Sequence, residues 1–364
     1  MPESLSDELN LFQKNIIEFL KNNIDLPSDE IKQKSVQSGY YSMQYADLFG
    51  ETSADCLKMV LAREAIAAFG IYNQEDILGR DLGVLKGVEG ALKKEYLIPV
   101  IEGQKSLSFA YTESDPDNPT VAVKTKNTLI VNGIKSYVSN AKTSDFICVV
   151  LDVQYASKTD KKATVIVDSN SEGFSIKETF QTLDGSDHSI IEFKNVKVPY
   201  SNLITSKGEV SPIYLNKLLQ ERIDQSAIAV GFSMFAMDFI TKKLTEPHRT
   251  GILLANKEGI RLRYSDMRIK TYAARSVLYR TARLLQQRKG IINEVTIAKF
   301  FCTETAFDVI DTAMQLGGGS ALILGSPLEV LYKKIRSMRI AGGANDILRL
   351  SISKGVFEFG SGIL

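Results

Sequence analysis

The carboxylate best placed for proton chemistry is Glu221, in the segment LLQERIDQSAIAVGF. If residues 216–240 form one helix, the face that carries Glu221 is otherwise mostly apolar. Its other members recur at spacings of three and four, and they are Leu218, Gln225, Ile228, Phe232 and Phe235. A carboxylate on such a buried helix is costly unless it is paired or functional, so the pattern predicts a general base. The alternative is a surface cap at the start of the helix, in which Glu221 pairs with Gln225 or Arg222.

Metal-binding and nucleotide-binding signatures are weak in this sequence. The chain has three cysteines, which lie far apart and form no CxxC pair, and only two histidines. This pattern favours a reducing compartment and gives no indication of a metal site. The chain contains neither G-x-G-x-x-G nor a Walker sequence, so a Rossmann-type or P-loop site is not indicated.

Length and charge narrow the class of protein. At 364 residues the chain is long enough for two or three domains. Its 44 basic and 43 acidic residues leave a net charge of +1, so neither a nucleic acid nor an anionic membrane is an expected partner. The segment MPESLSDELNLFQKNIIEFL is acidic and amphipathic, unlike a signal or transit peptide, and no apolar run is expected to span a bilayer. We therefore expect a cytoplasmic protein.

The period of the apolar residues divides the chain into three parts. Residues 1–105 show helical spacing and predict an N-terminal helical domain. Residues 106–204 hold short β-rich runs and predict a middle antiparallel β domain. Residues 205–364 return to long helical patterns and predict a C-terminal helical bundle. Within the β domain, Asn132-Gly133 is the strongest hairpin signal, because both residues accept the positive φ of a type I′ turn.

Five segments resemble, in order and spacing, the motifs of the acyl-CoA dehydrogenases, FAD enzymes that desaturate acyl thioesters between the α and β carbons. They are FAYTE from Phe109, NGIKSYVSNA, FKNVKVPYSNLI, YSDMRIKTYAARSVLYRTA and AMQLGGGSALILGSPLEVLYKKIRSMRIAGGANDILRL. The resemblance implies an α+β multidomain fold in which the C-terminal helices form a four-helix bundle. It also implies bound FAD and a homodimer or homotetramer, because FAD sites in the family are shared across dimers.

The resemblance places the flavin against the β domain. It implies that Tyr111 and Thr112 meet the pyrimidine edge of the flavin. Tyr137 would wall the ring in place of the usual Trp, and Ser139 would hydrogen-bond near the reactive nitrogen. The alternative is that these are strand residues chosen for β propensity. The other residues at cofactor-binding motif positions are Phe109, Asn118, Arg249, Gln315, Gly318, Gly319, Ala344 and Asp346.

Two glycines near the C-terminus match a family position where backbone approaches a cofactor held by a neighbouring subunit. Gln315, Gly318 and Gly319 correspond to its Gln-x-x-Gly-Gly. Glycine suits such an approach because it lacks a Cβ, although a plain helix stop is the alternative.

Some cofactor motifs depart from the family pattern. Asp-Asn-Pro at 117–119 replaces Gly-Ser-Asp, and Arg249 precedes Gly251 by two positions instead of four. Ala344 and Asp346 stand where a Thr and a Glu or Gln often meet the FAD. The resemblance therefore implies FAD binding through partly altered contacts.

The turn before the last helix lacks the family's usual catalytic base. Where the family typically reads Tyr-Glu-Gly-Thr, residues 341–344 read Ala-Gly-Gly-Ala, with Gly342 at the Glu position. Glu221 matches the alternative base position of the isovaleryl-CoA and long-chain branches. The resemblance implies that Glu221 takes the α-proton while the β-hydrogen leaves as hydride to the flavin. The N–H of Gly342 and a flavin ribityl hydroxyl would polarise the thioester carbonyl.

The resemblance leaves the partners and three other functions open. The electron acceptor could be an electron-transferring flavoprotein or oxygen. The acyl or aminoacyl group could be bound to a carrier protein instead of CoA. The chain could also be a non-catalytic subunit of a hetero-oligomer, or a flavin oxidase or monooxygenase. The sequence does not determine the length or branching of the acyl group.

Overall fold

The computed structural model describes residues 5–45, 55–156, 159–204, 212–247, 251–287 and 291–361. These residues form two compact units, each with a hydrophobic core of its own. One, the helical unit, combines residues 1–79 with residues 218–364, and the other, the β unit, spans residues 80–217. Residues far apart in sequence therefore share the core of the helical unit.

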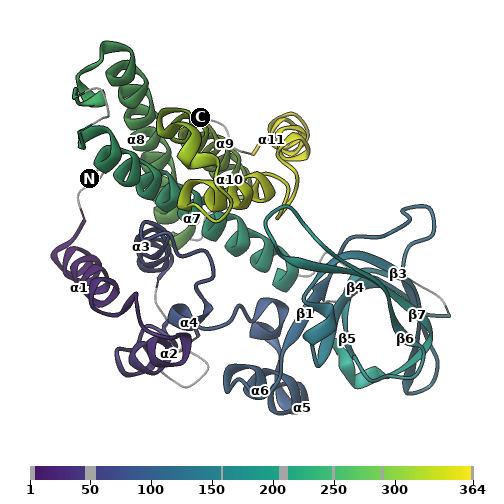
Figure 1. The fold of residues 1–364 in the computed structure, drawn as a ribbon. Helices are drawn as coiled ribbons and strands as arrows, with labels where there is room; N and C mark the ends of the chain where they lie inside the picture. Colours follow the sequence, from purple (N-terminus) through teal and green to yellow (C-terminus); the bar gives the residue numbers. More distant parts are fainter. Residues whose placement is uncertain are drawn as a thin grey trace. The chain divides into compact units, whose positions relative to one another are not determined.

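The helical unit consists mainly of long helices, coloured from purple to yellow along the chain in Figure 1. They are α1 (Asp7–Asn23), α2 (Ser28–Gln37), α3 (Cys56–Ala67), α4 (Glu75–Leu78), α7 (Pro212–Thr245), α8 (Glu258–Gln286), α9 (Ile292–Gly317), α10 (Pro327–Met338) and α11 (Asn345–Phe359). Capping side chains define two of the starts. Ser6 accepts a hydrogen bond from the N–H of Leu9 before α1, and Asp55 accepts one from the N–H of Lys58 before α3.

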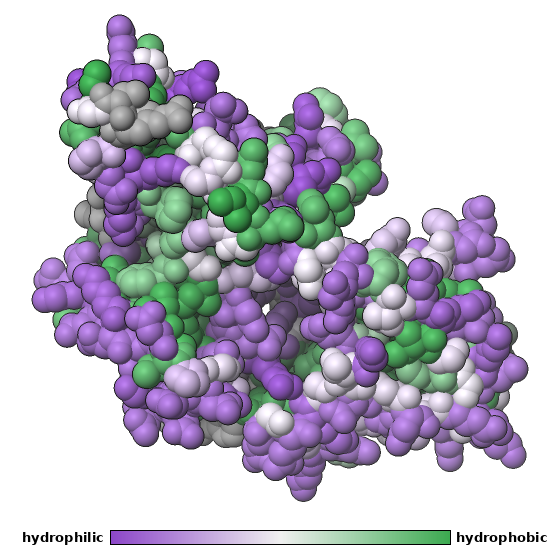
Figure 2. All heavy atoms as spheres, in the orientation of Figure 1, coloured by the Kyte–Doolittle hydropathy of each residue, from purple (hydrophilic) through white to green (hydrophobic). Residues whose placement is uncertain are grey.

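Hydrophobic side chains gather on the surface over α10 and α11 (Figure 2). Ile340 and Ile347 are each 58% exposed, and Leu350 is 66% exposed. A continuous exposed apolar area of this kind is typical of an interaction surface.

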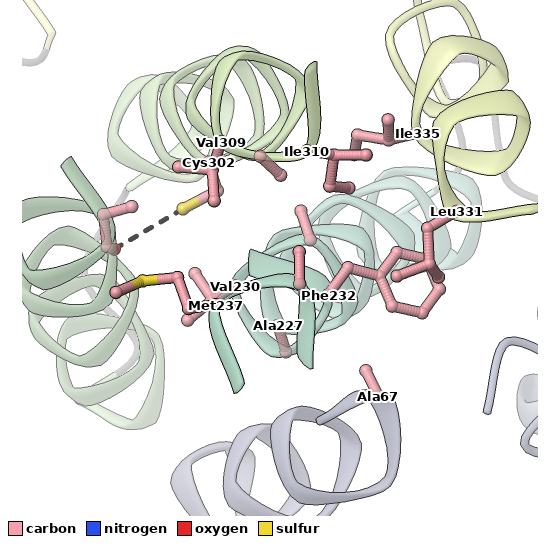
Figure 3. Close-up of a cluster of buried hydrophobic side chains, with 14 of the residues drawn as sticks. Ala67, Ala227, Val230, Phe232, Met237, Cys302, Val309, Ile310, Leu331 and Ile335 are labelled. Carbon is pink, nitrogen blue, oxygen red and sulfur yellow. Dashed lines mark hydrogen bonds between the residues drawn. The ribbon is translucent and has the colours of Figure 1, made fainter. Parts of the chain in front are cut away.

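Helices α3, α7, α8, α9 and α10 enclose the core of the helical unit (Figure 3). Phe232 of α7 and Ile310 of α9 are fully buried there. Helix α7 approaches α3 closely at Gly231, where an added Cβ would lie 2.4 Å from the carbonyl oxygen of Glu64 and 2.5 Å from the Cβ of Ala67. Glycine at position 231 therefore allows the two helices to pack in contact.

A buried ion pair joins α3 to α8. Glu64 is 1% exposed and accepts two parallel hydrogen bonds from Arg275, with Arg275 Nε 2.9 Å from Glu64 Oε2. The hydroxyl of Tyr279 donates to Glu64 Oε1 at 2.8 Å. A bidentate pair with a third hydrogen bond compensates the carboxylate for its lost hydration.

Helix α7 differs from the expectation that no segment could span a bilayer. Its part Lys217–Thr245 is long and apolar enough to do so by length and composition. However, 61% of its apolar window is buried inside the protein. Burial within a helical core explains the apolar composition, as in the central helix of a soluble bundle.

The β unit contains one mixed, mainly antiparallel sheet of eight strands among the described residues. The strands are β1 (Leu107–Ala110), β2 (Val121–Lys124), β3 (Thr128–Ser139), β4 (Phe146–Gln154), β5 (Thr159–Asp168), β6 (Phe174–Gln181), β7 (Asp187–Pro199) and β8 (Leu203–Ile204). Their order is β6-β7-β3-β2-β4-β5-β8, and β1 pairs with β4. Strand β4 pairs in parallel with both β1 and β2, a feature that the predicted antiparallel domain did not include.

The predicted hairpin turn at Asn132-Gly133 is wrong, because β3 runs unbroken through both residues. The chain reverses earlier, where the N–H of Thr125 donates to the carbonyl of Thr128 at 2.9 Å. Gly133 instead lies at an irregularity in the β3–β7 pairing with φ +140°. A Cβ there would lie 2.5 Å from the Cα of Thr120, so the glycine serves a close backbone approach.

Candidate active site

Glu221 lies well inside α7 on a half-buried face. Gln225, one turn later, donates from Nε2 to Glu221 Oε1 at 3.4 Å. The helix begins at Pro212, so the alternative of a cap at a helix start is wrong, although the Glu221–Gln225 hydrogen bond that it invoked is present. Gln225 therefore gives the carboxylate a neutral hydrogen-bond partner within the same helix.

The turn between α10 and α11 lies against this face of α7. Gly342 and Gly343 have φ values of +66° and +107°, a region that glycine adopts without strain. The Nε of Arg222 donates to the carbonyl of Gly342 at 3.3 Å, and Arg222 also donates to Thr296 Oγ1 at 2.9 Å. A Cβ on Gly342 would lie 2.9 Å from Nε2 of Gln225. Gln225 thus lies beside the turn and donates to the carboxylate of Glu221.

A buried lysine supports the same turn from α9. Lys299 is fully buried, and its Nζ donates to the carbonyl of Gly343 at 3.0 Å and to Oδ1 of Asn345 at 2.7 Å. Burial, and then the nearby Arg222, lower the pKa of Lys299 to about 8, while Glu221 acts in the opposite direction. Two cations therefore hold the carbonyls of successive turn residues.

Sequence reasoning assigned no role to Lys299. The available signal was a lysine within IAKFFC, an otherwise apolar stretch of a predicted helix. Asn345, the first residue of α11, extends the network by donating to Glu304 Oε1 at 2.6 Å. Glu304 in turn binds Arg339 through two hydrogen bonds of 2.7 Å. The turn is therefore fixed on both sides by charged contacts.

The backbone N–H of Gly342 is a hydrogen-bond donor that a substrate could use. Within the described ranges, no residue accepts a hydrogen bond from that N–H. An available N–H on a rigid turn can stabilise a developing negative charge on oxygen. Together with the Glu221 carboxylate, the arrangement can remove a proton and stabilise the resulting anion.

A second group of predicted residues meets in the β unit, around an exposed Tyr137. This residue has φ +57°, lies where the β3–β7 pairing is irregular, and is 65% exposed. The ring of Phe180 on β6 meets the Tyr137 ring edge-on, with centroids 6.0 Å apart. Ser139 is also exposed, and its Oγ lies 3.3 Å from Nδ1 of His188.

Tyr111 and Thr112 lie directly after β1, beside β3, and are both exposed. The N–H of Ser136 donates to the carbonyl of Thr112 at 3.1 Å, and Nζ of Lys135 donates to the carbonyl of Tyr111 at 3.0 Å. Lys135 is fully buried and forms an ion pair with Glu113. The structure therefore places Tyr111 and Thr112 next to the strand that carries Tyr137 and Ser139.

The remaining predicted cofactor residues occupy several places. In the β unit, Phe109 is half-buried on β1, and exposed Asn118 donates to Oδ2 of Asp115 at 2.7 Å. Arg249 lies outside the described residues. The others belong to the helical unit, at the end of α9 or the start of α11, and they are Gln315, Gly318, Gly319, Ala344 and Asp346.

A cavity of about 360 Å³ lies where α9, the end of α10 and the start of α11 meet. Ala344 and Asp346 line it together with three arginines, Arg336, Arg339 and Arg349. The two predicted residues therefore share a pocket, whereas the glycines at the end of α9 are exposed outside it.

Both units of the chain match models of one protein family. The family model for the acyl-CoA dehydrogenase middle domain matches residues 108–196, and that for the C-terminal domain matches residues 212–357. The chain belongs to the acyl-CoA dehydrogenase family. This confirms the family, and with it the fold class, that the sequence motifs predicted.

Several relatives resemble this family member over nearly its whole length. The 3-(aryl)acrylate reductase of Clostridium sporogenes is 27% identical over 363 residues, which cover 95% of this chain and 96% of the relative. The short-chain specific acyl-CoA dehydrogenase of Clostridium acetobutylicum is 24% identical over 381 residues, with coverages of 98% and 100%. The structure of butyryl-CoA dehydrogenase from Megasphaera elsdenii matches with a TM-score of 0.81 at 22% identity, covering 98% of this chain and all of that one. The structural likeness concerns the fold.

The acyl-CoA dehydrogenase fold binds FAD in this family, and the β unit offers a suitable surface for its planar ring. The positive φ of Tyr137 is costly for an aromatic residue, and its ring stays 65% exposed although it meets Phe180 edge-on. A planar ligand against Tyr137 would account for both features. The exposed backbone at Tyr111 and Thr112 adds polar groups beside it. The residues present therefore fit the cofactor.

Proposed function

We propose that this chain is an FAD-dependent acyl-CoA dehydrogenase in which Glu221 is the catalytic base. The observation that carries the proposal is the half-buried carboxylate of Glu221, whose hydrogen-bond partner Gln225 lies beside the turn at Gly342. The family model supports the reaction class. The turn itself supplies no carboxylate, so Glu221 is the acidic side chain that the turn's neighbour α7 provides.

Glu221 and the residues around the turn have different roles in the proposed reaction. Glu221 takes the α-proton of the acyl thioester onto its carboxylate, and the N–H of Gly342 hydrogen-bonds the thioester carbonyl as negative charge builds there. Bound FAD supplies the acceptor for the β-hydrogen, which leaves as hydride with its electron pair. Arg222 and Lys299 hold the carbonyls of Gly342 and Gly343, so the donor N–H keeps its direction.

The reverse reaction is the second candidate, because the first relatives by similarity carry reductase names. Besides the 3-(aryl)acrylate reductase, a subunit named CarC of a caffeyl-CoA reductase–Etf complex from Acetobacterium woodii is 27% identical over 340 residues. In that direction protonated Glu221 would return a proton to the α carbon. The same name supports an electron-transferring flavoprotein as redox partner, with oxygen as the alternative. A substrate carried on a protein instead of CoA also stays an alternative.

Association and location are further parts of this proposal. The exposed apolar side chains on and before α11 support a homodimer or homotetramer, because exposed apolar groups that gather in one place are typical of association surfaces. The three cysteines are free, which supports the reducing interior of a cell and a cytoplasmic location.

The test compares the wild type with Glu221→Gln, and with Glu258→Gln at the exposed start of α8 as a matched control. Each protein is titrated anaerobically with short, branched and long acyl-CoAs while the flavin absorption is recorded. We expect one class of acyl-CoA to bleach the wild type and the control. Glu221→Gln should stay yellow and lose turnover by a factor on the order of 10³ or more, since loss of a positioned base removes general base catalysis.

The outcomes separate the alternatives. Full activity in Glu221→Gln would exclude Glu221 as the base. A yellow wild type that no acyl-CoA bleaches would favour a protein-bound substrate, and bleaching by added reductant with reoxidation by an enoyl-CoA would favour the reductase direction. A colourless wild type that FAD cannot reconstitute would favour a non-catalytic subunit.

A further inference from the structure

His188 is the cross-strand neighbour of Ser139 in the β3–β7 pairing. It is one of only two histidines in the chain, and its ring is partly exposed. The motif reasoning assigned it no role. Its position next to the predicted flavin-facing residues makes its contacts informative.

A single ring nitrogen of His188 reaches both predicted flavin contacts. Its Nδ1 lies 3.2 Å from the carbonyl oxygen of Tyr137 and 3.3 Å from Oγ of Ser139. A carbonyl oxygen only accepts, so the contact with Tyr137 requires a proton on Nδ1. With that proton in place, Ser139 Oγ can only accept from Nδ1. The hydroxyl hydrogen of Ser139 is then available to a partner outside the sheet.

The ring of His188 also supports the aromatic surface. It stacks on Phe180 with centroids 6.4 Å apart and planes at 21°. Phe180 in turn meets Tyr137 edge-on at 84°. His188 therefore contacts the Tyr137 backbone through Nδ1 and the Tyr137 ring through Phe180.

The left-handed backbone of Tyr137 explains why such an anchor is needed. An aromatic residue with φ +57° departs from the extended conformation of its strand, and the β3–β7 pairing is irregular between Lys135 and Val138. The carbonyl of Tyr137 thus lies within a break of the regular ladder, where a side-chain donor can fix its direction. His188 supplies that donor from the neighbouring strand.

We propose that His188 is a positioning residue that holds the Tyr137 ring and the Ser139 hydroxyl toward the flavin through its Nδ1–H. The inference rests on the proposed function, because it presumes that FAD binds this surface. It adds a residue that controls how the flavin ring is held and how readily its nitrogen accepts a hydrogen bond.

The test uses two substitutions, to Asn and to Gln, whose side-chain amide nitrogens replace different nitrogens of the histidine ring. In His188→Asn the amide nitrogen falls near the place of Nδ1, whereas in His188→Gln it falls near the place of Nε2. Both substitutions remove the stacking on Phe180 equally, so the pair isolates the Nδ1 contact. The measurements are the FAD dissociation constant, the visible flavin spectrum, the flavin midpoint potential and the melting temperature of the apoprotein.

We expect His188→Gln to weaken FAD binding by about five- to tenfold, the loss that corresponds to one hydrogen bond, and to shift the flavin band and potential. His188→Asn should keep the FAD dissociation constant within about twofold of the wild-type value and keep the wild-type flavin band, because its amide nitrogen retains the donor near Nδ1. Equal behaviour of the two variants, or a wild-type spectrum and potential in His188→Gln, would overturn the positioning role. A fall in apoprotein melting alone would make His188 purely structural and would also overturn it.

The wild type is measured first, so that failure of the His188 inference can be told from failure of the proposed function. A yellow wild type with an indifferent His188→Gln overturns this inference and leaves the proposed function in place. A colourless wild type that FAD cannot reconstitute overturns both.

Discussion

Replacement of Lys299 by methionine tests whether the turn beside Glu221 is held by a buried cation. Methionine has a similar length and no charge, so Lys299→Met removes the ammonium group without leaving a large void. It also leaves the carbonyl of Gly343 and Oδ1 of Asn345 without the donor that they share in the wild type.

The magnitude follows from the pKa of Lys299, which burial lowers from 10.5 to about 8. Below pH 8 the folded and unfolded chains both carry the charge, and the folded chain bears a cost of about 3 kcal/mol for its burial. Between pH 8 and 10.5 the folded chain loses the proton while the unfolded chain retains it. The unfolded chain then binds more protons, so the free energy of unfolding rises with pH across this window.

The variant lacks this gain but loses two buried hydrogen bonds, at about 1–3 kcal/mol for each unsatisfied group. At pH 7 relief of the burial cost offsets much of that loss, so wild type and variant should unfold at similar urea concentrations. The free energy of unfolding of the wild type minus that of the variant should be about 3 kcal/mol larger at pH 10.5 than at pH 7. Comparing the two proteins cancels the other groups that titrate in this range.

Urea unfolding at pH 7, 8, 9, 10 and 10.5 measures the effect, with Lys270→Met as the control. Lys270 is half exposed and pairs with Asp308 on the surface, so its removal should not change the pH dependence. Parallel stability curves for wild type and Lys299→Met would refute the buried-cation argument.

Two further predictions concern the fold. Glu64→Ala should lower the free energy of unfolding by about 3–5 kcal/mol, because it leaves the largely buried guanidinium of Arg275 without its anionic partner. The double variant Glu64→Met/Arg275→Leu should recover most of this loss in urea unfolding, and a single-variant loss below about 1 kcal/mol would contradict the account. Gly133→Ala should destabilise the protein by about 3 kcal/mol through its φ of +140° and the clash with Thr120. An unchanged melting temperature would contradict the close approach of Thr120 to this position.

The change from helical to strand periodicity was readable from the sequence, because side-chain burial follows the period of each element. The apolar or alternating runs at β4 and β7 predict strands, and the structure forms them. The pattern around β3 predicts two strands joined at Asn132-Gly133, whereas the structure forms one. The short strand β1 and the largely exposed β6 were not recognised, since neither has a strong apolar pattern of its own. Their pairing partners lie far away in sequence, at β4 and β7.

Local signals failed where a distant segment set the conformation. Asn132-Gly133 has the composition of a turn, but the approach of Thr120 requires a glycine inside a continuous strand. Tyr137 carries no local signal for a positive φ, and its conformation accompanies the irregular pairing of β3 with β7. Such backbone states depend on contacts between strands, which composition does not encode.

Residue types and local spacing are enough to predict the family, the change from helices to a β domain and back to helices, and a carboxylate at Glu221 with none in the turn at Gly342. The folded structure adds that Arg222 and Lys299 hold that turn, that Gln225 lies beside it and donates to Glu221, and that His188 contacts Tyr137 and Ser139. The physical reason is that hydrogen bonds act over about 3 Å, and folding brings together donors and acceptors from different helices or strands.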